Sequence, residues 1–82
     1  DREKVRKQID RNYEIIADAV GRKNILNDGT APVITLKKNM IKPSVAKKWQ
    51  LYGLNSGGKI HIFLYSESAD FYKKLAHDIK NQ

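Results

Sequence analysis

The sequence contains no cysteine and no long apolar run. Without cysteine the chain can form neither a disulfide framework nor a thiolate metal site, which is typical of intracellular proteins. No apolar run approaches the ~20 residues of a membrane-spanning helix, and no signal-peptide pattern is present. We therefore expect no membrane span and an intracellular location, either cytoplasmic or at the nucleoid or nucleus. Because the first residue is Asp1 and not methionine, we also expect a processed product or an excised domain.

Acidic residues are missing from the middle of the chain. The segment from Gly29 to Ser66 has no Asp or Glu, although it carries several lysines: Lys37, Lys38, Lys42, Lys47, Lys48 and Lys59. A generic soluble surface would mix both signs. The net charge is +7 and the pI is near 9.8. This asymmetry favours an anionic partner such as nucleic acid or an acidic membrane surface.

The length of 82 residues predicts a single domain, residues 1–82, with one small core. An amphipathic helix is predicted from Asp1 to Val20, and Gly21 is placed to end it with a left-handed cap. Its apolar residues recur at spacings that put them on one stripe: Val5, Ile9, Tyr13, Ile16 and Val20. We expect this stripe to join the core. The alternative is docking to a protein partner, or self-association, through Val5, Ile9 and Ile16.

Residues 33–82 are predicted to form the sheet and a closing helix. Residues 33–38 and 59–65 alternate between apolar and polar side chains, which is the period of a β-strand. Asn55-Ser56-Gly57-Gly58 is a turn sequence, so residues 47–65 are predicted as a β-hairpin whose first strand is residues 47–54. The closing helix is predicted from Ala69 to Lys80 by its apolar stripe: Phe71, Tyr72, Leu75, Ala76 and Ile79.

The segment before the turn also fits a second interpretation. Ser44 could be the N-cap of a short helix and Gly53 its C-cap, with Val45, Trp49 and Tyr52 on one face. We prefer the strand, because residues 47–54 match residues 59–65 in length across a Gly-containing loop. A helix followed by a hairpin would instead resemble a winged helix.

These elements predict an α+β fold in the order α-β-β-β-α, a two-layer domain whose antiparallel three-stranded sheet packs on helices. The alternative is a winged-helix-like fold. Period-two alternation assigns one side of the sheet to the core: Ile34, Leu36, Trp49, Leu51, Ile60, Ile62 and Leu64. The other side then carries a mixture of basic, polar and aromatic residues: Thr35, Lys37, Lys48, Gln50, Tyr52, Lys59, His61, Phe63 and Tyr65.

This second side has the residue types that bind nucleic acids. Lysines meet phosphates, aromatic faces stack on unpaired bases, and His or Thr can reach base edges. The candidate nucleic-acid-binding residues are Lys37, Lys38, Lys42, Lys47, Lys48, Tyr52, Lys59 and His61. Whether Phe63 and Tyr65 stack on bases or are covered by the first helix stays open at this point.

Signals for catalysis are weak. His61 and His77 lie on different predicted elements and form no metal-ligand spacing, so we expect no metal site and no cofactor. Ser56-Gly57-Gly58-Lys59 lacks the full GxxxxGK[ST] pattern of a phosphate loop, and we interpret it as a turn. One catalytic alternative remains, a small basic ribonuclease using His61 with Lys59 or Lys48.

Two families share parts of this pattern. Residues 33–82, with Lys47-Lys48-Trp49 and Gly57-Gly58-Lys59, resemble the three-stranded-sheet DNA-binding modules of the integrase arm-binding type. The order α-β-β-β-α and Lys73-Lys74-Leu75-Ala76 resemble the double-stranded-RNA-binding domain, although His77 stands where that motif continues with lysine. Both resemblances imply nucleic-acid binding.

The sequence therefore predicts a non-catalytic nucleic-acid-binding domain, with DNA favoured over RNA, that contacts phosphates through a lysine-rich sheet or hairpin face. A protein-interaction module that docks through the N-terminal helix and the small ribonuclease are the alternatives.

Overall fold

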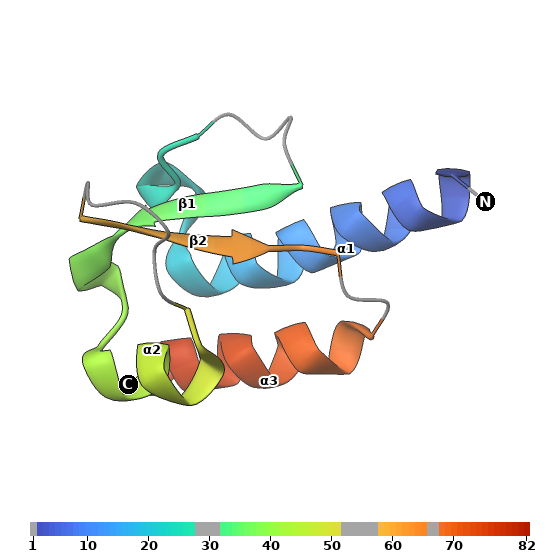
Figure 1. The fold of residues 1–82 in the computed structure, drawn as a ribbon. Coiled ribbons are helices and arrows are strands. Elements are labelled where there is room, and N and C mark those ends of the chain that lie inside the picture. The colour runs from blue at the N-terminus through green and yellow to red at the C-terminus, as the bar shows by residue number, and fades with distance from the viewer. Residues whose placement is uncertain (1, 28–31, 52–57, 66–67) are drawn as a thin grey trace.

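The chain folds into helices and a small antiparallel sheet (Figure 1). The structure is a computed structural model that describes residues 2–27, 32–51, 58–65 and 68–82. Within these residues the helices and strands follow in the order α1 (Arg2–Val20), β1 (Val33–Lys37), α2 (Pro43–Trp49), β2 (Lys59–Phe63) and α3 (Ala69–Lys80). Short 3₁₀ turns occupy Arg22–Asn24 and Lys38–Met40. None of the described helices is long and apolar enough to cross a membrane.

The prediction of a three-stranded sheet is wrong. The described residues form a two-stranded antiparallel sheet, in which β1 pairs with β2 from Val33 opposite Phe63 to Lys37 opposite Lys59. Both strands lie where alternation predicted them, and α1 and α3 also match their predicted positions. The hairpin is therefore built from β1 and β2, and its connection is the whole of residues 38–58.

The start of the segment predicted as the middle strand is helical. Residues 47–49 form the end of α2, as the alternative interpretation proposed, and residues 52–54 lie outside the described residues. Pro43 opens this helix, because its fixed φ suits the first helical position and its missing N–H is not needed there. Gln50 ends it in the left-handed region, with φ 56° and ψ 43°. The predicted caps differ, since Ser44 lies inside the helix and Gly53 is outside the described residues. Because α2 lies between the two strands and not before a hairpin, the winged-helix-like alternative is not formed either.

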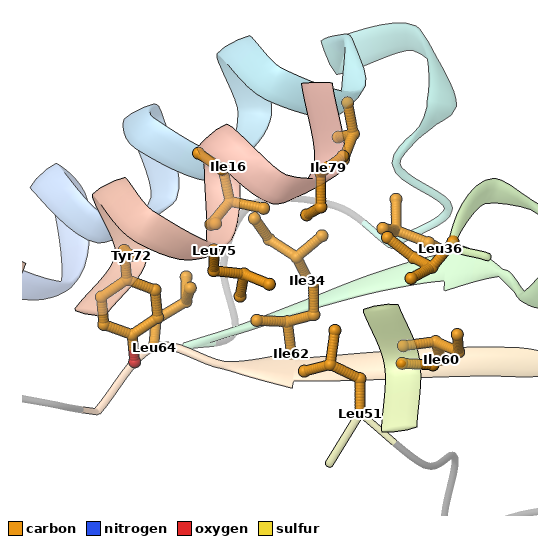
Figure 2. Packing of buried hydrophobic residues seen from close by; sticks show 14 residues of the cluster. Ile16, Ile34, Leu36, Leu51, Ile60, Ile62, Leu64, Tyr72, Leu75 and Ile79 are labelled. Atoms are coloured by element: carbon orange, nitrogen blue, oxygen red, sulfur yellow. The ribbon is translucent and has the colours of Figure 1, made fainter. Parts of the chain in front are cut away.

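The core lies between the inner face of the sheet and the two long helices. Figure 2 shows strand residues such as Ile34 and Ile62 meeting Ile16 from α1 and Leu75 and Ile79 from α3. In Figure 2 α1 and α3 both lie on the same side of β1 and β2, so the domain has two layers. Each large side chain buried in this way stabilises the fold by roughly 1.5–3 kcal/mol. Leu51, just after α2, is also buried in this core.

A buried polar side chain, Asn12 of α1, ties this helix to the end of β2. The ladder continues beyond the strands, where the Leu64 amide donates to the Pro32 carbonyl at 3.0 Å. The reciprocal bond cannot form, because proline has no N–H. Asn12 Nδ2 donates to the Leu64 carbonyl instead, at 3.0 Å, and the Asn12 side chain is fully buried. Asn12 therefore supplies the donor that Pro32 lacks.

Replacing Asn12 by alanine should destabilise the protein markedly, because the Leu64 carbonyl would lose its donor in the interior. We expect Asn12→Ala to lower the free energy of unfolding by about 1–3 kcal/mol in urea denaturation. Gln8→Ala is the matched control. Gln8 Nε2 donates to Asn12 Oδ1 at 3.0 Å from a partly exposed position, so the effect should be smaller. Equal losses in the two variants would contradict the role of Asn12.

Candidate nucleic-acid interface

The side of the sheet that faces away from the helices is the candidate interface, and we call it the outer sheet face: Val33, Thr35, Lys37, Lys59, His61, Phe63 and the following Tyr65. The ladder bonds from Lys38 to Gly58 and from Leu64 to Pro32 flank β1 on both sides, so the hydrogen-bonded pairs of the ladder involve even-numbered residues. The pairs 33/63, 35/61 and 37/59 are therefore non-hydrogen-bonded pairs, in which side chains approach each other most closely. Their side chains share this one face.

Two lysines stand opposite each other at one end of this face. Lys37 is the register partner of Lys59, and both side chains are exposed. Neither lysine forms an ion pair with any residue that the structure describes. Like charges directly across a strand pair destabilise the sheet, so this arrangement does not serve folding. An anion bound between the two ammonium groups would remove the repulsion.

The middle of the outer sheet face is a fixed polar pair. Thr35 Oγ1 lies 3.1 Å from His61 Nδ1, and Thr35 is only 8% exposed. The free edge of β1 is covered by Leu26, whose amide donates to the Thr35 carbonyl at 2.8 Å, and by Asn27. The Asn27 side chain donates to the Val33 carbonyl and accepts from the Thr35 amide, like a backbone group of a third strand. Thr35 and His61 therefore hold a defined position on the face.

An aromatic pair occupies the other end. The rings of Phe63 and Tyr65 lie 6.2 Å apart between centroids with planes 19° apart, and the residues are 50% and 62% exposed. The interpretation that the first helix covers them is thus wrong. The Phe63 carbonyl accepts from the Tyr72 hydroxyl at 2.7 Å, which fixes the backbone below the rings. Neither residue was among the sequence candidates, although alternation placed both on this side.

The eight sequence candidates do not form one cluster. Lys37, Lys59 and His61 share the outer sheet face, and Lys38 follows Lys37 in the adjoining 3₁₀ turn. The others belong to a different part of the fold or lie outside the described residues: Lys42 precedes α2, Lys47 and Lys48 are on α2, and Tyr52 is not described. The predicted basic surface is therefore divided between the sheet and α2.

Lys48 already has a partner in the fold. Its Nζ lies 2.9 Å from Asp78 Oδ2 on α3, and the same oxygen accepts from Trp49 Nε1 at 2.7 Å. The Lys48 hydrogen bond, followed by the Trp49 hydrogen bond, holds the pKa of Asp78 below its usual value. Trp49 also packs edge-on against Phe71, with centroids 5.2 Å apart. Lys48 and Trp49 therefore fasten α2 to α3.

The predicted docking stripe on the first helix is divided between the core and the surface. Ile16 is fully buried in the core and Ile9 is partly buried, whereas Val5 is 53% exposed near the N-terminus. The stripe is thus core along its second half. Within the residues that the structure describes, no three His, Asp or Glu side chains cluster as metal ligands would.

Comparisons of this chain with protein-family models, with curated proteins and with solved structures give no match. The two resemblances seen in the sequence both depend on three strands, and the two-stranded sheet does not reproduce them. The geometry of the outer sheet face therefore carries the functional argument by itself.

The carboxylate of Asp78 should make stability depend on pH in the acid range. Because its pKa is lowered on folding, the ionised form stabilises the fold above the unfolded-state pKa of about 3.9, and this contribution is lost as the pH falls through the folded-state value. We expect Asp78→Asn to lower the Tm at pH 7, and the gap to the parent protein to narrow below about pH 4.

Asp10→Asn is the matched control for this prediction. Asp10 is exposed on α1 and has no ion pair with the described residues, so its Tm at pH 7 should stay close to that of the parent. A gap between Asp78→Asn and the parent that is the same at pH 7 and pH 3 would count against the Asp78 interaction.

Proposed function

We propose that this chain is a non-catalytic domain that binds single-stranded nucleic acid on the outer sheet face. The observation that carries the proposal is the presence, on one face, of two groups at opposite ends. At one end Lys37 and Lys59 lie opposite each other without an ion pair to any described residue, and at the other end the Phe63 and Tyr65 rings are exposed. Lysine ammonium groups neutralise phosphates, and aromatic rings accept bases by stacking. The basic charge of the chain agrees with such a partner.

The spacing of these two groups suits a short stretch of an extended strand. Lys59 and Phe63 are four residues apart on β2, which corresponds to about 13 Å at the rise of a β-strand. A single nucleic-acid strand that lies along β2 can place phosphates at Lys37 and Lys59 and bases on the aromatic rings. Between these two groups lies His61, which is partly exposed on the same face.

The aromatic pair favours single strands over duplexes. Base faces are covered by stacking inside a duplex, and only unpaired bases can lie flat on exposed rings. The sequence favours DNA over RNA, so single-stranded DNA is the first probe, with RNA and duplexes as comparison. The ribonuclease alternative loses one of its groups, since Lys48 is bound to Asp78 on the other side of the fold.

Removing one lysine of the pair should weaken binding and reduce its dependence on salt. For Lys37→Gln and for Lys59→Gln we expect weaker binding of single-stranded DNA. The slope of log K against log salt should become shallower by about 0.7 for each lost phosphate contact. Anisotropy titrations with a labelled oligonucleotide at several salt concentrations measure this slope. Lys80→Gln is the control. It makes the same charge change at an exposed position of α3 and should leave the slope unchanged.

Removing the aromatic rings should weaken binding to single strands selectively. Phe63→Ala and Tyr65→Ala should each cost about 1–3 kcal/mol of binding free energy for each base that stacks. Both residues are exposed, so the Tm should change little. Duplex DNA of the same sequence is the comparison, and its affinity should hardly move. An equal loss for single strands and duplexes, or no binding of any nucleic acid at low salt, would refute the proposal.

A further inference from the structure

A second basic site lies at the junction of α2 and α3, away from the outer sheet face. A surface pocket there is lined by Lys48, Trp49, Lys73, Lys74, His77 and Asp78. Lys48 and Trp49 come from the end of α2, and the other four residues come from the middle and the second half of α3. The helices form the layer beneath the sheet, so this pocket and the outer sheet face belong to different layers of the domain.

The wall of the pocket is held in place before any ligand arrives. Asp78 Oδ2 accepts from both Lys48 Nζ and Trp49 Nε1, and the Trp49 ring is fixed edge-on against Phe71. Lys48 Nζ also lies 5.5 Å from the centroid of the Trp49 ring. A preorganised wall of this kind loses little freedom when a ligand binds.

The charge of the lining is unbalanced. Three lysine ammonium groups face one carboxylate, and that carboxylate is already engaged by Lys48 and Trp49. Lys73 and Lys74 are exposed and form no ion pair with the residues that the structure describes. The pocket therefore has a surplus of two positive charges, both on adjacent residues of α3.

We propose that this pocket binds a phosphomonoester group through Lys73 and Lys74, next to the Trp49 wall. A phosphomonoester carries a charge of about −1.5 to −2 at pH 7, which matches the surplus of the lining. Lysines bind phosphoryl oxygens as point charges and do not need the fixed geometry of arginine. The group could belong to a free small molecule or to the 5′ end of a nucleic acid, and the chemistry of the pocket is the same for both.

Trp49 makes the site directly observable, because it is the one tryptophan of the chain. The test is a titration followed by the NMR signal of the Trp49 indole N–H and by the amide signals of α3. The ligands are ribose 5-phosphate, with ribose as its control, and a 5′-phosphorylated oligonucleotide, with the 5′-hydroxyl form as its control. We expect saturable shifts at Trp49, Lys73 and Lys74 with a phosphorylated ligand and none with its control.

The two phosphorylated ligands distinguish the sources of the group. Saturation by ribose 5-phosphate supports a small-molecule ligand, and saturation by the 5′-phosphorylated oligonucleotide alone assigns the site to a nucleic-acid end. Lys73→Gln combined with Lys74→Gln should weaken this binding at least tenfold. Lys37→Gln combined with Lys59→Gln, which tests the outer sheet face, should leave the binding of ribose 5-phosphate unchanged.

The proposal is overturned if no phosphorylated ligand gives saturable shifts, if the unphosphorylated controls act equally well, or if both double variants weaken binding to the same extent. Loss of nucleic-acid binding in the Lys37 and Lys59 variants alone bears only on the outer sheet face. Failure of one site is therefore distinguishable from failure of the other.

Discussion

Pro32 has no backbone N–H, and a side chain of α1 replaces this donor at the junction of the sheet and the helices. Where the ladder passes beyond β1, the carbonyl of Leu64 faces a nitrogen without hydrogen, and the buried amide of Asn12 supplies the bond. One residue earlier, the hydroxyl of Tyr72 meets the Phe63 carbonyl. The two long helices thus hold the end of β2 through polar bonds as well as through the core. These bonds fix the backbone of the chain at the position from which the Phe63 and Tyr65 side chains project into solvent.

The two sides of the sheet differ in their contribution to stability. A two-stranded sheet is marginally stable in water, and here its stability comes from Ile34, Ile62 and their neighbours packed on α1 and α3. The opposite side carries Lys37 and Lys59, which have no ion pair with the described residues and repel each other, and the exposed rings of Phe63 and Tyr65. The proposed nucleic-acid-binding function rests on this second side.

Much of this architecture could be predicted from the sequence, because α1, α3, β1 and β2 have strong hydrophobic periods. The segment of α2 could not, since Trp49 and Leu51 alternate as in a strand while Pro43 favours a helix start, and only tertiary packing decides. The positions of the candidate residues were predicted in part. Alternation placed Lys37, Lys59 and His61 on one face, where they lie, but the bond from Lys48 to Asp78, 30 residues away, leaves no local signal. Asn12 was missed for the same reason.

The long connection between the paired strands shapes how the chain can fold. β1 ends at Lys37 and its partner begins only at Lys59, with a whole helix in between. The entropic cost of closing a loop of this length adds about 1–2 kcal/mol of free energy over the four-residue turn of a tight hairpin. The sheet therefore cannot nucleate locally, and folding should be slower than for a domain of the same size built on adjacent strands. During synthesis β1 leaves the ribosome well before β2 and α3. The apolar side of β1 therefore becomes fully buried only after these two elements have been made.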